Sequence, residues 1–228
     1  MGRRAVVGVV VVVGVLVGGA AVADGVIRER TEERLATDLQ TQIPGLDTPP
    51  EVTISGFPFL TQVLAGELQD VHVTAPTATV EGLRMEQIDV RLRGVTTGEP
   101  YSARDAGMTA FLPIRAVQDA LGIPFDLAVS GEYLTTSATV LGLAVDVELV
   151  PRAAGRAIEI DVETFGLGGV RVGAQDLPRG LGDQLQGLSF PVEGLPQGIE
   201  LTDLRVRGDG VELTAEGTDV VLDETALP

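Results

Sequence analysis

The chain has 228 residues and a formal net charge of −17, with 33 acidic residues against 16 cations, all of which are arginine. It contains no lysine, asparagine, cysteine or tryptophan, and His72 is its single histidine. This composition excludes a cysteine nucleophile, a lysine Schiff base and a Cys/His zinc site, and it disfavours nucleic-acid binding through a basic surface. An apolar fraction of 44% is typical of a folded chain, whose core must be aliphatic and without disulfides.

An uncharged apolar segment follows Arg3 and Arg4 and extends over residues 5–23, up to Asp24. As a helix this segment rises about 28 Å, close to the thickness of the hydrocarbon core of a bilayer. Two interpretations stay open, namely a signal peptide cleaved after Ala23 and a retained transmembrane anchor with its positive end inside. Both interpretations place the rest of the chain outside the cytoplasmic membrane, in the cell envelope or secreted.

Helical spacing of apolar residues marks three segments, over residues 27–42, 114–121 and 177–188. The first helix connects the apolar segment to the rest of the chain, as a stalk or as the first element of a domain. We therefore divide the chain into residues 1–23 as signal peptide or anchor, 24–48 as the helix or stalk, and 49–228 as one folded domain.

Strict alternation of apolar and polar residues dominates the chain from residue 51 onward. The clearest alternating segments are 71–75, 88–93, 143–149, 158–163 and 203–207. Such alternation is typical of antiparallel strands with one apolar face, and Asp209-Gly210 predicts a tight hairpin turn. The predicted fold class is α+β, with curved antiparallel sheets on a few amphipathic helices. Similar patterns in 66–95 and 194–222 suggest an internal pseudo-duplication.

Motifs for catalysis or for metal binding are not apparent. No serine lies in a G-x-S-x-G motif, and the chain contains no phosphate-binding glycine loop. Glu159, Asp161 and Glu163 share one strand face, where a solvated surface is favoured over a calcium site because a straight strand does not surround an ion. We therefore predict no catalytic residues, no metal and no cofactor.

Arg84, Arg91 and Arg93 fall within ten residues of one another and are candidates for contacting the phosphate of a lipid headgroup. Acidic residues lie close to them in the sequence, so cross-strand ion pairing is the favoured role.

The segment Gly56-Phe57-Pro58-Phe59-Leu60 concentrates two of the six phenylalanines, and its proline excludes a central strand position. Two roles have equal weight for it. One is core packing at the start of a strand, and the other is the mouth of a pocket for an apolar ligand.

The apolar N-terminal segment, the following helix, the Gly56–Leu60 motif and the sequence GELQDVHV of residues 66–73 together resemble the actinobacterial LmeA-like phospholipid-binding proteins. Residues 195–222 look like the end of that family's domain, and the resemblance covers about 50–225. The resemblance implies an extracytoplasmic phospholipid-binding protein with a curved sheet packed on helices, similar to tubular lipid-binding domains. Phosphatidylinositol-type lipids are among the implied ligands. The family's named member is linked to maturation of mannose-bearing lipoglycans.

The predicted function is therefore binding of phospholipid in the envelope, with membrane contact through the N-terminal segment and without nucleic acid. Each buried methylene contributes about 0.8 kcal/mol, so apolar contacts alone can hold a two-tailed lipid. Two alternatives remain, a membrane-anchored interaction module without a lipid ligand and a carboxylate hydrolase of cell-wall glycans. The residues expected to contact lipid are Phe57, Phe59, Leu60, Ile114, Val117, Leu121, Leu181 and Leu185.

Overall fold

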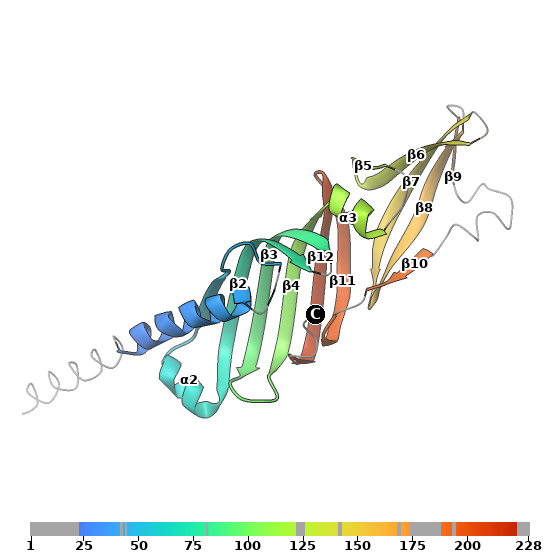
Figure 1. The fold of residues 1–228 in the computed structure, drawn as a ribbon. Helices are drawn as coiled ribbons and strands as arrows, with labels where there is room; N and C mark the ends of the chain where they lie inside the picture. The colour runs from blue at the N-terminus through green and yellow to red at the C-terminus, as the bar shows by residue number, and fades with distance from the viewer. Residues whose placement is uncertain are drawn as a thin grey trace, which may run out of the picture.

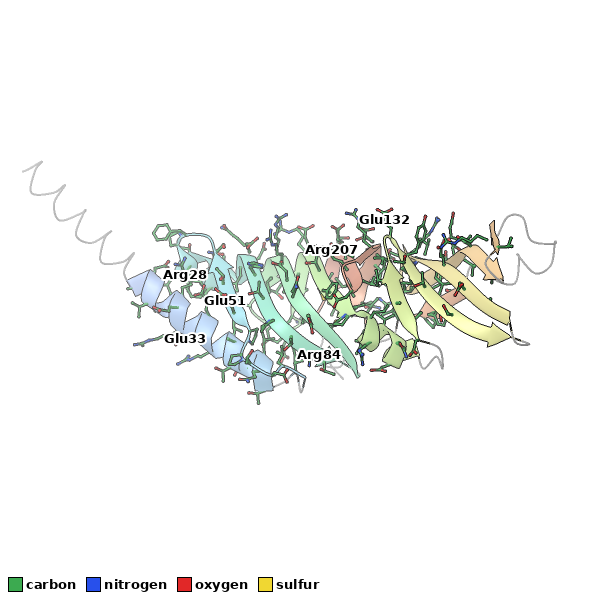
Figure 2. The ribbon with its side chains drawn as sticks, turned by 90° about the horizontal axis from the view of Figure 1, so that it is seen from above. Arg28, Glu33, Glu51, Arg84, Glu132 and Arg207 are labelled. Atoms are coloured by element: carbon green, nitrogen blue, oxygen red, sulfur yellow. The ribbon has the colours of Figure 1, made fainter. Side chains whose placement is uncertain are left out.

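The structure is a computed structural model that shows two antiparallel sheets arranged one after the other along a long axis (Figure 1). Seen from above, Glu51 of the first sheet and Glu132 beside the second lie far apart along this axis (Figure 2). The residues that the structure describes are 23–41, 43, 45–80, 82–121, 126–140, 143–167, 170–173, 188–192 and 195–222.

The first sheet has six strands in the order β1-β2-β3-β4-β12-β11, each antiparallel to its neighbours. Its alternating sequences place one apolar and one polar face on the sheet, as predicted. A β-bulge between Glu86 and Asp89 shifts the register of β3 against β4, and Gln87 there has a φ of 52°. Such bulges increase the local twist and bend of a strand. The strands are β1 (Glu51–Ser55), β2 (Glu67–Val80), β3 (Leu83–Thr96), β4 (Ser102–Pro113), β11 (Gln197–Arg207) and β12 (Gly210–Val221).

The second sheet has the order β10-β8-β7-β6-β5, and β9 also pairs with β8. Its connection to the first sheet runs through the turn between β7 and β8, where the amide of Leu201 donates to the carbonyl of Gly155 at 2.7 Å. The strands are β5 (Leu127–Ser130), β6 (Tyr133–Val140), β7 (Leu143–Ala154), β8 (Ala157–Leu167), β9 (Val170–Gly173) and β10 (Leu188–Pro191).

Three helices accompany the sheets in the described part of the chain. The N-terminal helix (residues 23–41) lies against the β1 side of the first sheet, α2 (Phe59–Ala65) precedes β2, and α3 (Ile114–Leu121) follows β4 (Figure 1). None of the described helices is both long enough and apolar enough to span a membrane. The apolar segment predicted as signal peptide or anchor falls on residues that lie, except for Ala23, outside the described ranges.

Two apolar cores stabilise the first sheet. One contains Val52, Ile54, Phe59, Leu68 and Val71, and Leu35 and Leu39 of the N-terminal helix pack against it. The other extends from the β4, β12 and β11 strands to Leu134 of the second sheet. The second core therefore joins the two sheets, and the first core joins the N-terminal helix to the first sheet.

The predicted α+β class with curved antiparallel sheets is confirmed, and each of the five alternating segments lies in a strand. The hairpin turn between β11 and β12 is shifted by one residue from the prediction. Its central residues are Gly208 and Asp209, because glycine readily adopts the φ of 63° that the turn requires there.

The third predicted helix was wrong at its end, because Leu188 begins β10 and pairs with Ile160 of β8. The preceding residues 174–187 lie outside the described ranges. Segments 66–95 and 194–222 both contribute a hairpin to the first sheet, β2–β3 and β11–β12. The internal pseudo-duplication stays a prediction.

Candidate functional site

One row of cross-strand partners crosses all six strands of the first sheet on its apolar face. The register pairs these residues successively, in the order Val52, Val73, Val90, Met108, Ala215 and Leu201. Each strand contributes an aliphatic, alanine or methionine side chain because the alternation keeps its polar residues on the other face. The row therefore forms an uninterrupted uncharged strip across the full width of the sheet.

The two ends of this row are buried, and its middle is not. Val52, Ala215 and Leu201 are at most 7% exposed and belong to the two cores. Val73, Val90 and Met108 are half-buried on the three central strands. Val90 belongs to neither core, whereas Leu92 packs on one core and Ile88 on the other. An apolar surface is therefore left partly open between the N-terminal helix and α3.

Helix α3 places two of the predicted lipid contacts beside this surface. Ile114 and Val117 pack against the core that also takes up Met108 and the β3 residues Met85 and Ile88. Leu121 is the last residue of the same helix. The structure thus brings Ile114 and Val117 to the apolar face of the first sheet.

Two other predicted lipid contacts, Leu181 and Leu185, lie outside the described residues.

The structure separates the predicted mouth residues from one another. Phe59 is only 2% exposed and packs in the core beside Val52 and Ile54. Phe57 and Leu60 instead face solvent, with exposed fractions of 66% and 37%. Of the two roles left open for this motif, core packing describes Phe59, and a surface role remains available to Phe57 and Leu60.

Arg84, Arg91 and Arg93 lie on the opposite, polar face of β3 from the apolar row. All three are more than half exposed, and each forms an ion pair, with the Nε atoms of Arg91 and Arg93 3.3 Å and 3.6 Å from carboxylate oxygens of Asp89 and Asp70. Only the pair of Arg93 with Asp70 connects two strands. A headgroup role for these arginines stays a prediction, and the structure does not bring them together with Ile114 and Val117.

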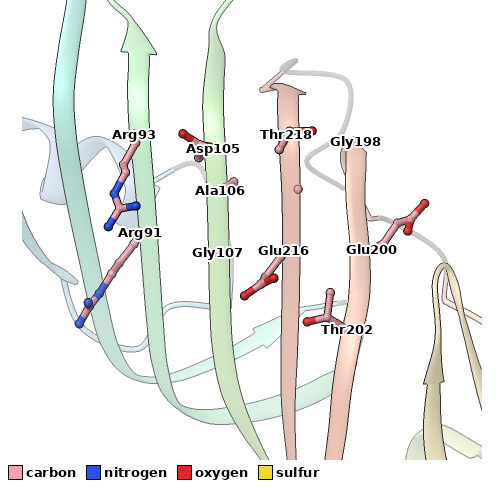
Figure 3. A pocket seen from close by; sticks show the side chains of 11 residues that line it. Arg91, Arg93, Asp105, Ala106, Gly107, Gly198, Glu200, Thr202, Glu216 and Thr218 are labelled. Carbon is pink, nitrogen blue, oxygen red and sulfur yellow. The ribbon is translucent and has the colours of Figure 1, made fainter.

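A pocket of about 660 Å³ opens on this polar face across β3, β4, β12 and β11 (Figure 3). Gly107 forms part of its floor between two cross-strand partners, Arg91 on β3 and Glu216 on β12. A Cβ atom at residue 107 would meet nothing within 4 Å, so the missing side chain contributes directly to the hollow. Charged groups of both signs surround it, among them Arg93 and Asp105. This pocket is suited to a polar ligand, unlike the cavity expected for acyl chains.

In the described residues, no three histidine or carboxylate side chains gather in a way that could hold a metal ion. Asp161, one of the three acidic residues on β8, forms a 3.0 Å ion pair with Arg152 of the neighbouring strand β7.

An elongated pair of curved sheets with a partly open aliphatic face defines a β-rich protein suited to apolar ligands. The model of the LmeA-like phospholipid-binding family matches residues 22–216. The chain belongs to this family, and the resemblance seen in the sequence is confirmed at that level. Comparison with curated proteins gives no match, and neither does comparison with solved structures.

The central members of the apolar row, Val73, Val90 and Met108, were not among the residues that the sequence predicted as lipid contacts. The alternation of β2 and β3 was visible, but it does not show which apolar positions are covered by helices. The sequence signal for this surface was the alternating run of aliphatic residues on β3, Ile88, Val90 and Leu92.

Proposed function

We propose that the protein is an extracytoplasmic phospholipid-binding protein of the cell envelope, which holds acyl chains on the apolar face of its first sheet. The observation that carries the proposal is the half-buried centre of that face, at Val73, Val90 and Met108, in a chain of a phospholipid-binding family. Acyl chains bury methylenes at about 0.8 kcal/mol each, and this surface offers them contacts without charge.

The location outside the cytoplasmic membrane is part of the proposal. It is supported by the uncharged segment 5–23 after Arg3 and Arg4, acting as a cleaved signal or as an anchor. The division into residues 1–23, 24–48 and 49–228 belongs to it as well. Packing of Leu35 and Leu39 on the first sheet supports a helix that is part of the lipid-binding unit.

We further propose that the ligand is of the phosphatidylinositol type and that the protein supports maturation or transport of lipids or mannose-bearing lipoglycans. The resemblance to the family, whose named member is linked to such maturation, supports this. The proposed role is binding without catalysis, and it is supported by the lack of a catalytic motif in the sequence. An actinobacterial origin is supported by a composition without lysine or asparagine, which is typical of a high-GC gene.

Native mass spectrometry of the purified chain, combined with lipid extraction from the same sample, tests the proposal. The expected result is a protein mass increased by a phospholipid, which exchanges for phosphatidylinositol supplied in vesicles. A mass that stays bare after incubation with phosphatidylinositol vesicles would reject lipid binding. It would favour the anchored interaction module instead.

A further inference from the structure

Exposed apolar side chains gather at one end of the molecule, around α2. The short helix lies at the end of the first sheet remote from the second sheet (Figure 1). Single exposed apolar residues are normal on protein surfaces, but a group of them marks an interaction site. The group consists of Phe57 and three residues of α2, Leu60, Val63 and Leu64, and Val26 and Ile27 are also exposed on the N-terminal helix.

The side chains of this group are highly exposed, and the segment that contains Phe57 and α2 has no charged residue. Leu64 is 87% exposed and Phe57 is 66% exposed. Residues 56–66 contain no acidic or basic side chain, although 21% of all residues in the chain are charged. In a protein with a net charge of −17, an uncharged surface is where an anionic bilayer repels the chain least.

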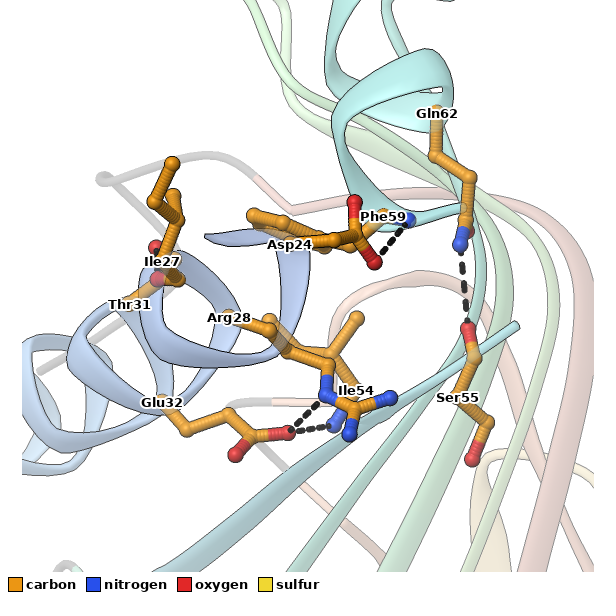
Figure 4. Close-up of polar contacts among 9 residues, drawn as sticks. All are labelled: Asp24, Ile27, Arg28, Thr31, Glu32, Ile54, Ser55, Phe59 and Gln62. Carbon is orange, nitrogen blue, oxygen red and sulfur yellow. Dashed lines mark hydrogen bonds and ion pairs between the residues drawn. The ribbon is translucent and has the colours of Figure 1, made fainter. Parts of the chain in front are cut away.

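Hydrogen bonds attach α2 to the start of the N-terminal helix. The carboxylate of Asp24 accepts hydrogen bonds from the backbone amide of Phe59 at 2.9 Å (Figure 4) and from that of Leu60 at 2.8 Å. Pro58, at the N-cap position of α2, supplies no side-chain cap, so Asp24 caps this helix from a distant part of the chain. Asp24 directly follows the apolar segment 5–23 in the sequence. The position of α2 is therefore fixed relative to the residue at which that segment ends.

We propose that α2 and Phe57 form a docking surface for a lipid bilayer, with Phe57, Leu60 and Leu64 in its interfacial layer. This placement puts the β1 edge of the first sheet at the membrane and the second sheet away from it. The proposal deepens the proposed function and rests on it for the presence of a bilayer. It holds whether the segment 5–23 is retained or removed, because the exposed side chains belong to the folded unit.

The chain contains no cysteine, so a single introduced cysteine carries an environment-sensitive fluorophore without further changes. The probe position is Leu64→Cys, and the matched control is Val170→Cys in β9, where the side chain is 64% exposed. Each labelled full chain is mixed with phosphatidylcholine–phosphatidylglycerol vesicles, with and without nitroxide-labelled lipids. The apolar face of an interfacial helix lies about 5–10 Å into the boundary between headgroups and acyl chains, so we expect roughly half of the fluorescence at residue 64 to be quenched.

The label at residue 170 is expected to keep its emission and to escape quenching. Equal, water-like emission from the two positions on vesicles would overturn the docking surface. A blue shift at residue 64 without vesicles that grows with protein concentration would overturn it in favour of a second copy of the chain. Lipid extraction from each labelled protein before the vesicles are added separates the two proposals. Bound phospholipid without quenching at residue 64 contradicts only the docking surface, and quenching without bound phospholipid contradicts only the lipid-carrying function.

Discussion

Asp24 is a buried charged residue whose role is settled by its contacts. Its side chain is 3% exposed, and each of its carboxylate oxygens accepts a hydrogen bond from a backbone amide at the start of α2. Glu32, on the same helix, accepts a hydrogen bond from the backbone amide of Ile54 at 2.7 Å (Figure 4). The same carboxylate oxygen lies 3.9 Å from the Nε atom of Arg28. The N-terminal helix is therefore held by polar contacts to two elements in addition to the packing of its leucines.

We predict that Asp24→Ala lowers the free energy of unfolding by about 2 kcal/mol, because one buried and one partly buried amide lose a charged acceptor. Urea denaturation followed by circular dichroism measures this change. Asp38→Ala, an exposed position on the same helix, serves as the control and is expected to change stability by less than about 0.5 kcal/mol. Equal losses for the two variants would show that the cap contributes nothing.

If acyl chains lie on the apolar face as proposed, Val90 is the residue whose change should affect lipid binding most directly, because it lies between the two cores. We predict that Val90→Asp strongly reduces the fraction of protein carrying phospholipid in native mass spectrometry, since it places a charge on the acyl-chain surface. Val90→Thr keeps the shape and strand preference, and it is expected to give a smaller reduction. Arg91→Gln, adjacent but on the polar face, is expected to retain lipid. Full loading of a folded Val90→Asp variant would refute the assignment of this face.

The strands were predictable from the sequence because their alternation is local, whereas α2 was not. Seven residues are too few to show a helical period, and the cap of α2 comes from Asp24, which is 35 residues before Phe59. At Leu188 the local pattern predicts a helix, which the structure does not have at this residue. Its spacing from earlier leucines fits a helix, but its pairing with Ile160 in the second sheet places it in a strand.

Two glycines in strands of the first sheet, Gly107 and Gly217, differ in the space that a Cβ atom would have. A Cβ atom at Gly107 meets open space, whereas at Gly217 it would lie 2.1 Å from the carbonyl oxygen of Gly198. We predict that Gly107→Ala stabilises the protein by about 0.5–1 kcal/mol, because glycine in a strand is entropically unfavourable.

Gly217→Ala is the matched control, and it is expected to lower the melting temperature because the β11 backbone must move. Thermal unfolding of the two variants provides the comparison. Similar melting temperatures for the two alanine variants would contradict the close approach of β11 and β12 at Gly217.

At the scale of the whole molecule, Arg156 connects the two sheets. Its guanidinium donates to the carbonyl oxygens of Leu195, Pro196 and Ile199 at 2.6 Å, 3.0 Å and 3.1 Å. These bonds hold the β7–β8 turn against the start of β11, next to the bond between the Leu201 amide and Gly155.

We predict that Arg156→Ala increases amide hydrogen exchange at Leu201 by roughly tenfold, as expected for losing contacts of about 1–2 kcal/mol. NMR measurement of the exchange rate of the Leu201 amide, in the variant and in the wild type, tests this increase. Arg152→Ala, which removes only an exposed ion pair within the second sheet, is the control and leaves this amide unchanged. Unaltered exchange in Arg156→Ala would mean that the hydrogen bonds of Arg156 do not stabilise the junction between the sheets.

The sequence predicts which residues share a face of the first sheet, but not which part of that face the helices cover. Alternation around Val90 and Arg91 indicates that these neighbours lie on opposite faces, and the structure confirms this. The sequence does not show that helices leave the middle of one face partly open, because that depends on where Leu39 and Ile114 pack. It also does not show that the strands divide into two consecutive sheets. That division depends on long-range pairing, such as β4 with β12.

Above all, we propose that acyl chains lie on the apolar face of the first sheet. Photocrosslinking of the purified chain with a phospholipid that carries a diazirine in its acyl chain tests this claim most directly, with the modified residues located by mass spectrometry. We expect crosslinks at and around Val73, Val90 and Met108, and we expect nonphotoreactive phosphatidylinositol to compete them away. Crosslinks confined to the polar pocket around Arg91, Gly107 and Glu216 would contradict it.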